Sequence, residues 1–483
     1  MIVHRTGHPW GAPTHERPPA ARARRACVNA SRMGCAASRV RAAPEGREAD
    51  PLLFDLVIVG AGYAGLCALE AAVGYHKRGH RIAIVDRRHS WGGHWVEQYG
   101  FVTLHQPRQQ YTPGNEKWPD KDQPERLATK SEVLAHFERC ARKLSRRASI
   151  TCLFGHEYDE NAALINSESG APRLHLSCST VDTGCDIPKS THHITARGLI
   201  RALGHSTVPL RAPLVLSSSR VRSVAICDPI IESPSTAGEC VYLVGSGKTA
   251  LDVANHILAS PEPPAKLVLI TGRGVCFMNR EMLFPSGAPP PGAINFCSFV
   301  HRLVLMAGEK SPEALPALIE QLKKEGFLLS PSPHAEVLRN GIASPVEVEA
   351  VAAGATFEAG HLLDVSDDGA AGPRLVIRRL DGCVQHVPIE EGALVVNCTS
   401  NYPTGEHAVR LEPLLSCGGR VLTTRSELAD SGTTANLLTS LWCRGTLDKI
   451  SSELVFACSN GRLSEGAKAA LDQAQLRSRA PLA

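Results

Sequence analysis

The sequence predicts an α/β fold with two parallel β-sheets, and three observations carry that prediction. Two apolar runs of the kind that buried parallel strands use, 55–59 and 241–244, each lead directly into a glycine-rich loop. Each loop is followed by a helix-like segment, at 66–72 and at 251–258. The two loops lie about 185 residues apart in a chain of 483 residues, which is long enough for more than one domain.

Composition and charge exclude several classes of function. Apolar residues make up 43% of the chain, enough for two hydrophobic cores. The formal net charge is +4, but residues 1–44 hold eight arginines and one acid, so the remainder carries −3 and has no basic surface for nucleic acid. The sixteen cysteines form no CxxC pair, which argues against a dithiol redox centre and a cysteine-rich zinc site, and we expect no metal. We interpret them as reduced thiols of an intracellular protein.

The first fifty residues are rich in Arg, Ala and Pro without periodicity, so we expect 1–50 to be a disordered extension. An Arg-rich, acid-poor leader is also typical of an organelle transit peptide, which leaves cytoplasmic and organellar locations open. If translation starts at Met33, Gly34 and Cys35 fit a myristoyl and palmitoyl anchor. We expect no transmembrane helix, because the longest uncharged run, 282–301, holds four prolines.

The first glycine loop has the pattern GxGxxG. In this pattern the first glycine makes a tight turn, the second lets the backbone approach a diphosphate, and the third lets the helix pack closely. The helix N-terminus attracts the same anion. A second apolar strand, 81–85, ends at Asp86, where a carboxylate accepts hydrogen bonds from a ribose, and we add the adjacent Arg87 to the site. The loop residues of this predicted Rossmann-type, three-layer dinucleotide-binding domain are Gly60, Ala61, Gly62, Tyr63, Ala64 and Gly65.

A glycine-tryptophan segment follows the acid, and residues 91–95 read Trp-Gly-Gly-His-Trp. Together with the glycine loop and Asp86, this segment resembles the flavin-containing monooxygenase-like superfamily, whose members are flavoproteins with two dinucleotide-binding domains. The resemblance implies that the first domain binds FAD. Gly93, His94 and Trp95 would then lie against the cofactor, because backbone without side chains can approach the flavin or its diphosphate.

The segment 101–108 passes near the flavin ring according to the same resemblance. It makes His105, Gln106 and Arg108 the candidate catalytic residues. The alternative interpretation is an ordinary polar loop packed on the surface of the domain.

The chain from 129 to 203 is predicted to complete this part of the first domain. A T-x-x-E capping box opens a helix over 129–144, whose apolar residues recur at helical spacing. Strand-like stretches at 150–154, 173–177 and 193–195 indicate a β-meander that ends near residue 203.

The second glycine loop has the pattern GxGxxA, which tolerates alanine at the packing position. It is not a P-loop, because that motif requires glycine where this chain has Tyr242. The following strand, 266–270, is followed by no acid but by Arg273, which can pair with the 2′-phosphate of NADPH. We therefore predict NADPH rather than NADH, the alternative being a solvated loop arginine. The predicted binding residues of this loop are Gly245, Ser246, Gly247, Lys248 and Thr249.

The rest of the chain is predicted from shorter patterns. We expect a helical insertion at about 275–345 that caps the cleft, with one helix between 311 and the stop residue Gly326. Short strands separated by turns follow over 346–387, then a buried strand at 394–399 and a helical stretch at 433–458. The predicted domains are 1–50, disordered; 51–235, the first part of the FAD-binding domain; 236–392, the NAD(P)H-binding domain; and 393–483, the return to the FAD domain with C-terminal helices.

The predicted function is that of an FAD- and NADPH-dependent oxidoreductase, a monooxygenase that transfers one oxygen atom of O2 to a small organic substrate. The FxGxxxHxxxW-type fingerprint of flavin-containing and Baeyer–Villiger monooxygenases is absent, and this departure bears on the oxygen transfer more than on the cofactors. The missing CxxC argues against a disulfide reductase. A reductase or dehydrogenase without oxygen transfer, and a non-catalytic FAD-binding regulator, remain as alternatives.

Overall fold

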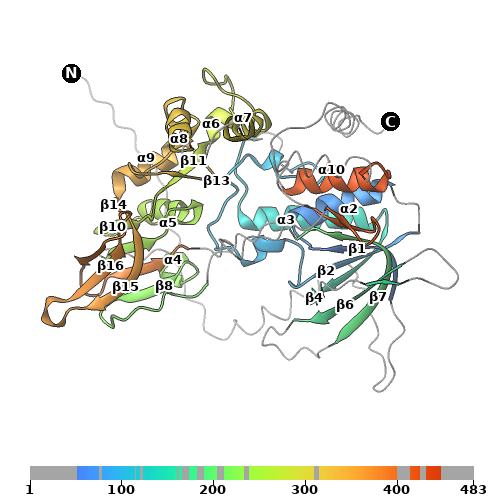
Figure 1. The fold of residues 1–483 in the computed structure, drawn as a ribbon, viewed down its shortest axis with the longest axis horizontal. Coiled ribbons are helices and arrows are strands. Elements are labelled where there is room, and N and C mark those ends of the chain that lie inside the picture. Colours follow the sequence, from blue (N-terminus) through green and yellow to red (C-terminus); the bar gives the residue numbers. More distant parts are fainter. Residues whose placement is uncertain are drawn as a thin grey trace, which may run out of the picture. The chain divides into compact units, whose positions relative to one another are not determined.

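The computed structural model describes thirteen stretches of the chain (Figure 1). All of them belong to one compact unit, Ala43–Ala483. The predicted extension 1–50 with its lipid-anchor positions lies outside the described residues. No helix in the described part is long and apolar enough to span a bilayer. The described stretches are 52–75, 79–114, 116–119, 123, 125–159, 163–165, 173–181, 190–203, 211–232, 239–308, 315–399, 414–424 and 431–447.

The first sheet has the strand path β19-β20-β7-β1-β2-β3, and neighbours from β20 to β3 run parallel. The strands predicted at 55–59 and 81–85 are its neighbouring inner strands β1 and β2. Leu56 and Ile58 belong to the core on one face, and Val57 and Val59 belong to the core on the other. Both faces are covered at residues 56–59, and this part of the strand is entirely apolar. The bounds are β1 (Leu52–Val59), β2 (Arg81–Asp86), β3 (Ser149–Phe154), β7 (Thr191–Arg201), β19 (Leu415–Ser416) and β20 (Val421–Thr423).

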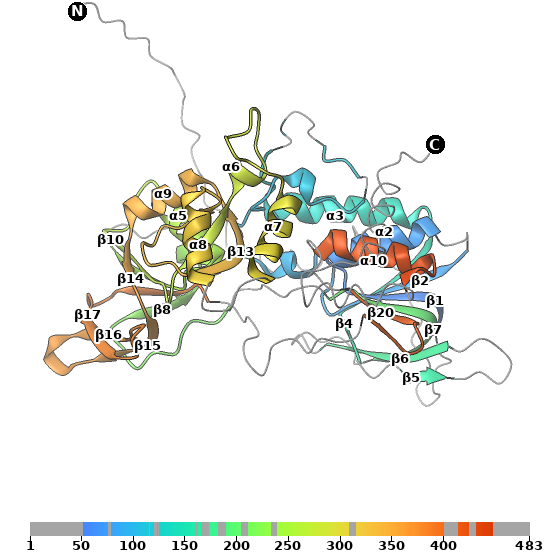
Figure 2. The ribbon, with the colours of Figure 1, turned by 45° about the horizontal axis from the view of Figure 1, so that its top comes forward.

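Three helices cover one face of this sheet and short strands cover the other. The helices α2 (Tyr63–Tyr75), α3 (Lys130–Ser145) and α10 (Ser431–Cys443) lie on the same side, with α2 between the other two (Figure 2). The opposite face carries β4 (His156–Tyr158), β5 (Ala163–Ile165) and β6 (Arg173–Thr180). The expected helix over 129–144 is confirmed as α3, whose N-cap Thr129 and N3 residue Glu132 form a capping box.

The β-meander predicted for 150–203 is wrong in part. Strand β3 does not belong to a meander, because it pairs in parallel with β2 from Ser149 to Phe154. Strand β7 is eleven residues long and pairs antiparallel with β6 and parallel with β1 and β20. The antiparallel part consists of β4, β5 and β7, each of which pairs with β6, so the predicted strands at 173–177 and 193–195 are antiparallel neighbours as expected.

The second sheet has the order β14-β10-β9-β18-β8, with every pair parallel. The helices α5 (Lys248–Leu258) and α9 (Pro345–Gly354) lie side by side (Figures 1 and 2). A three-stranded antiparallel sheet, β15-β16-β17, packs against the strands through a shared apolar core. The strand bounds are β8 (Arg222–Ala225), β9 (Cys240–Val244), β10 (Lys266–Ile270), β14 (Thr356–Glu358), β15 (His361–Asp367), β16 (Pro373–Arg378), β17 (Val384–Pro388) and β18 (Leu394–Asn397).

Two strands of the second sheet lie outside the range 236–392 that the sequence predicts for this domain. The buried strand β18 pairs with β9 on one side and with β8 on the other, so it closes the second sheet before the chain returns to the first. The return is made by β19, β20 and α10, since β20 pairs with β7 and α10 packs on α2.

The insertion between β10 and β14 contains a sheet as well as helices. Besides the helices of the predicted helical insertion, it holds the three-stranded sheet β12-β11-β13, which the sequence does not predict. The start of the predicted strand region 346–387 is wrong, because Ser344 and Glu347 form a capping box that begins helix α9. Gly326 follows α8 with a φ of +79°, as expected for a helix stop. The bounds are β11 (Val275–Asn279), α6 (Arg280–Leu283), α7 (Phe296–Gly308), α8 (Leu315–Lys324), β12 (Leu328–Leu329) and β13 (Val337–Ala343).

Candidate functional site

The first glycine loop needs glycine at two positions for steric reasons. Gly60 has a φ of +110°, and a Cβ built there would clash with the carbonyl of Ala202 at the end of the neighbouring strand. A Cβ on Gly65 would clash with the carbonyl of Gly60. The loop therefore turns tightly from β1 into α2, and the first amides of α2 point out of the helix end.

The glycine-tryptophan segment folds back onto this loop. The amide of Gly92 donates to the carbonyl of Ala61 at 2.9 Å, and a Cβ on Gly62 would lie only 3.3 Å from Cα of Gly93. Gly92 and Gly93 both have positive φ, at +136° and +55°. The backbone of the predicted Gly93, His94 and Trp95 is therefore adjacent to the N-terminus of α2.

Asp86 ends β2 beside the same loop and is 7% exposed. Its two carboxylate oxygens accept the amides of Ala61 at 2.7 Å and of Arg88 at 2.8 Å. The guanidinium of Arg88 lies 3.9 Å from this carboxylate and pairs with Glu97 at 2.6 Å. The predicted Arg87 is exposed. Arg88 is thus the inward-facing arginine of the pair, which the sequence does not indicate.

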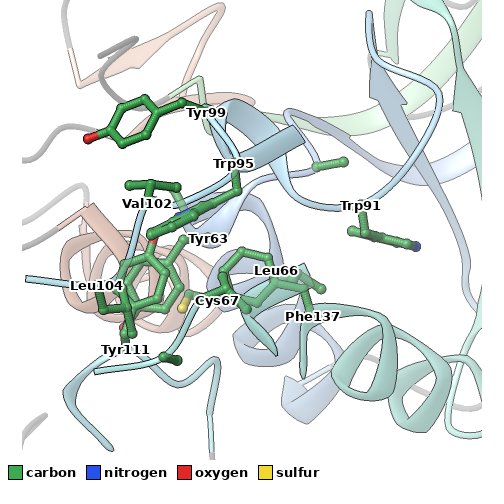
Figure 3. Packing of buried hydrophobic residues seen from close by; sticks show 14 of the residues in the cluster. Tyr63, Leu66, Cys67, Trp91, Trp95, Tyr99, Val102, Leu104, Tyr111 and Phe137 are labelled. Carbon is green, nitrogen blue, oxygen red and sulfur yellow. The ribbon is translucent and has the colours of Figure 1, made fainter. Parts of the chain in front are cut away.

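The side chains of Tyr63 and Trp95 belong to a buried aromatic cluster (Figure 3). The rings of Tyr63 and Tyr111 stack with centroids 4.0 Å apart, and Nε1 of Trp95 donates to the Tyr111 hydroxyl at 2.9 Å. Phe137 of α3 stacks against both tyrosines. These side chains fix the loop and the glycine-tryptophan segment, while the backbone of both borders the site.

His105 is held by two groups from the second half of the chain. Its Nδ1 accepts the amide of Ile342 at 3.2 Å, and its carbonyl accepts Nε of Arg280 at 2.8 Å. Burial, followed by the charges of Lys248 and Arg280, lowers the pKa of His105 to about 3. The ring is therefore neutral, and because Nδ1 accepts a hydrogen bond, the proton sits on Nε2. No described residue bonds Nε2.

Gln106 and Arg108 lie in different surroundings although they are close in sequence. Oε1 of Gln106 is buried and has no hydrogen-bond partner among the residues described. Arg108 is 1% exposed, its amide donates to the carbonyl of Arg126, and its guanidinium lies 5.8 Å from the ring centroid of Trp118. The structure therefore gives His105 and Gln106 unused hydrogen-bonding atoms and puts Arg108 in the core.

The second glycine loop repeats the geometry of the first. Gly245 has a φ of +130°, and its amide donates to the carbonyl of Ile270 at 3.0 Å. Gly247 is the N-cap of α5, which has no side-chain cap. A Cβ on Gly247 would meet none of the described residues within 4 Å. Ser246 turns inward, and its hydroxyl donates to the carbonyl of Thr271 at 2.8 Å.

Thr271 occupies the position that Asp86 has in the first fold. Each lies 26 residues after the first glycine of its loop, at the end of the neighbouring strand. Thr271 is 3% exposed, and its hydroxyl lies 2.9 Å from Nε2 of His334, a residue of the insertion. The predicted Arg273 is exposed two residues later. The equal spacing is the sequence signal by which Thr271 could have been found.

Four charged side chains from α5, α6 and α9 lie together next to the second glycine loop. Lys248 pairs with Asp252 and lies 3.6 Å from Glu347, and Arg280 lies 2.6 Å from Glu347. Thr249 follows Lys248 in the first turn of α5. Asp252 also accepts the hydroxyl of Tyr99 at 2.7 Å. Among the described residues, no three His, Cys, Asp or Glu side chains are grouped to hold a metal ion.

Known protein sequences are similar to this chain over only a short segment. No protein-family model matches the chain. Uncharacterised proteins of Mycobacterium bovis and Mycobacterium tuberculosis are 37% identical over 57 residues, which is 12% of this chain. The chain thus matches about a tenth of the length of these curated relatives.

Solved structures resemble the chain over most of its length. The polycyclic ketone monooxygenase of Thermothelomyces thermophila is 15% identical, with 90% of this chain and 85% of that chain covered and a TM-score of 0.51. A steroid monooxygenase bound to NADP is 15% identical, with 82% and 86% covered and a TM-score of 0.49. A flavin-containing monooxygenase of Stenotrophomonas maltophilia is 14% identical, with 83% and 99% covered and a TM-score of 0.43.

The predicted fold class is confirmed by the two sheets, by the two glycine loops and by the likeness to the fungal ketone monooxygenase. The chain has the α/β fold of the flavoproteins that carry two dinucleotide-binding domains.

Proposed function

We propose that this chain is an oxidoreductase that holds FAD at its first glycine loop and NADPH at its second. The observation that carries the proposal is the repetition of one geometry in both sheets. In each, a buried strand ends at a glycine with positive φ and a helix of at least eleven residues begins within three residues. The N-terminus of such a helix attracts a diphosphate.

The first site fits FAD. Gly60 to Gly65 would hold the diphosphate at the N-terminus of α2, and Gly62 and Gly93 lack side chains where the two backbones meet. Asp86 would hold the ribose, because each carboxylate oxygen keeps a lone pair after accepting one backbone amide. The backbone of His94 and Trp95 would border the flavin, and the exposed Arg87 would lie at the rim.

The second site fits NADPH. Lys248 and the uncapped amides of α5, with Gly245, Ser246, Gly247 and Thr249, would hold the diphosphate. The position of the ribose-binding acid carries the neutral hydroxyl of Thr271, which does not repel a 2′-phosphate. Arg273 would pair with that phosphate from the exposed loop.

Hydride delivery to the flavin and electron transfer from it are the chemistry that the two cofactors supply when bound. This chain adds two hydrogen-bonding atoms next to the second half of the molecule. His105 would donate from Nε2 to the reacting group without changing charge, and Oε1 of Gln106 would accept. We propose that Arg108 supports this segment from the core, because it is buried against Trp118.

The specific reaction that we propose is the transfer of one oxygen atom of O2 to a small organic substrate. It rests on the resemblance of the glycine loop and the glycine-tryptophan segment to flavin-containing monooxygenases. A reductase or dehydrogenase without oxygen transfer uses the same two cofactors. A non-catalytic FAD-binding regulator uses only the first.

The test begins with the purified chain loaded with FAD. NADPH oxidation, O2 uptake and H2O2 release are measured with and without a panel of ketones, thioethers and amines under isotopically labelled O2. For a monooxygenase, at least one compound lowers H2O2 release and gains one labelled oxygen atom. H2O2 release that equals NADPH oxidation with every compound favours a reductase, and bound flavin without NADPH oxidation favours the regulator.

A further inference from the structure

Glu347 joins two features of the proposed site that lie far apart in the sequence. It belongs to the first turn of α9, which packs beside α5. Its Oε1 lies 3.6 Å from the ammonium of Lys248, the lysine of the second glycine loop. Its Oε2 lies 2.6 Å from the guanidinium of Arg280, at the start of α6.

Arg280 carries this link to the segment that holds His105. The Nε atom of Arg280 donates to the carbonyl of His105 at 2.8 Å, and the adjacent β13 donates the amide of Ile342 to the ring. Arg280 therefore faces a carboxylate with one end of its guanidinium and the candidate catalytic segment with the other. A change in the first contact alters the restraint on the second.

The charges of this cluster balance only while the glycine loop is free of an anion. Lys248 and Arg280 oppose Asp252 and Glu347, and all four side chains are between 14% and 25% exposed. Charges in such partly buried surroundings interact more strongly than in water. A diphosphate at the N-terminus of α5 adds negative charge next to Lys248. Of the two ion pairs that Lys248 makes, the longer one, to Glu347, is the weaker.

Glu347 is ionised in this setting. Burial by itself raises the pKa of its carboxyl group, but the charges of Lys248 and Arg280 and the hydrogen bonds from Ser344 outweigh burial and hold the pKa below its ordinary value.

We propose that Glu347 is a positioning residue that couples occupancy of the second glycine loop to the placement of His105. When a nicotinamide dinucleotide diphosphate attracts Lys248, Glu347 is released from the lysine and holds Arg280 alone, which fixes the carbonyl of His105. Without the diphosphate, Glu347 is shared between both cations. This inference rests on the proposed function, since it takes the second loop to be a dinucleotide site.

The test uses Glu347→Gln in the FAD-loaded chain. Glutamine keeps the capping box that begins α9, because either residue serves at that position. The substitution removes one negative charge beside Lys248, so we expect the Kd for NADP⁺, measured by calorimetry, to fall about fivefold. Arg280 loses its anionic partner, so we expect kcat for NADPH oxidation to fall about tenfold. Tighter nucleotide binding with slower turnover is an effect that loss of structure does not produce.

The matched control is Glu349→Gln, the same change on the exposed side of the same helix, for which we expect wild-type values. Lys248→Gln provides the second variant. In the double variant Lys248→Gln, Glu347→Gln the gain in NADP⁺ affinity disappears, because it acts through the lysine.

Two results overturn the coupling. One is a Glu347→Gln variant whose Kd and kcat both match Glu349→Gln, and the other is an affinity gain that persists in the double variant. Failure of the wild-type chain to bind NADP⁺ at all refutes the proposed function instead, so the two failures are distinguishable.

Discussion

At the scale of single residues, the two positions proposed to hold a ribose differ in charge. Asp86 presents a carboxylate, whereas Thr271 presents a hydroxyl at the same place in the second fold. Asparagine in place of Asp86 keeps one acceptor but loses the charge-assisted hydrogen bonds, so we expect Asp86→Asn to weaken FAD binding about tenfold or more. Flavin retained after dialysis measures this.

The control for this change is Asp55→Asn at the other end of the first sheet. Asp55 also accepts a backbone amide, that of Arg81 at 3.0 Å, but it lies on the far side from the glycine loop. Equal flavin loss in both variants contradicts the assignment of Asp86.

Arg273 is proposed to distinguish NADPH from NADH at the second site. Arg273→Ala removes the predicted partner of the 2′-phosphate, so we expect the KM for NADPH to rise about tenfold or more, while the KM for NADH stays within twofold. Steady-state kinetics with both cofactors measures the difference. A proportional rise in both KM values refutes the phosphate role.

His105 makes the stability of the chain depend on pH. Burial lowers its pKa from 6.5 to about 3, so between these values the unfolded chain binds a proton that the folded chain does not. The free energy of unfolding therefore falls as the pH is lowered through this range, by up to about 1.4 kcal/mol per pH unit. In His105→Gln we expect a smaller loss between pH 7 and pH 5, measured by urea unfolding. Parallel losses in both proteins would exclude this assignment.

At the scale of elements, α3 supports the aromatic cluster beside the first glycine loop. Its capping box holds the first turn, and Phe137 on its buried face stacks against Tyr63 and Tyr111. Thr129→Ala removes the N-cap acceptor, so we expect the free energy of unfolding to fall by about 1 kcal/mol. Thr129→Ser retains a capping hydroxyl and should recover most of the loss in the same chemical denaturation experiment. No recovery would contradict the capping explanation.

The elements that the sequence predicts well are those with a local physical signal. Capping boxes, buried apolar strands and positive-φ glycines depend on neighbours within a few residues, so the strands at 55–59 and 241–244, both glycine loops and α3 appear where expected. The prediction of a strand at 346 is wrong because the apolar residues of 346–353 do not recur at helical spacing. Its capping box at Ser344 and Glu347 was the signal that indicates a helix.

At the scale of the whole molecule, the segment from Tyr99 to His105 joins the first half of the chain to elements of the second. Tyr99 donates to Asp252 at 2.7 Å, the amide of Gly100 donates to Glu232 at 2.7 Å, and Phe101 stacks on His256 with centroids 3.9 Å apart. The candidate catalytic segment is therefore anchored by residues more than 130 positions away.

We expect Tyr99→Phe to weaken this connection by about 1–3 kcal/mol, because Asp252 loses a buried donor. Unfolding followed by flavin release and by circular dichroism should then separate into two transitions. Tyr75→Phe is the matched control, since the Tyr75 hydroxyl also has a charged hydrogen-bond partner, Arg444, but its side chain is exposed. Coincident transitions in Tyr99→Phe, as in the control, would contradict the anchoring role.

The sequence by itself determined the two glycine loops, the strands that lead into them and the acid that we propose for the first ribose. These features follow from local sterics and from a spacing of 26 residues that is the same in both folds. The sequence also indicated His105 and Gln106 as candidate catalytic residues. It did not indicate which of their atoms, Nε2 of His105 and Oε1 of Gln106, lack a hydrogen-bond partner among the described residues.

Only the tertiary structure decided which strands join which sheet and which charges meet. The partners of β18 are strands some 150 and 170 residues earlier in the chain, and the link from Lys248 through Glu347 and Arg280 to His105 joins four separate segments. No local pattern encodes such contacts, because they form only when distant segments pack and exclude water from the charges between them.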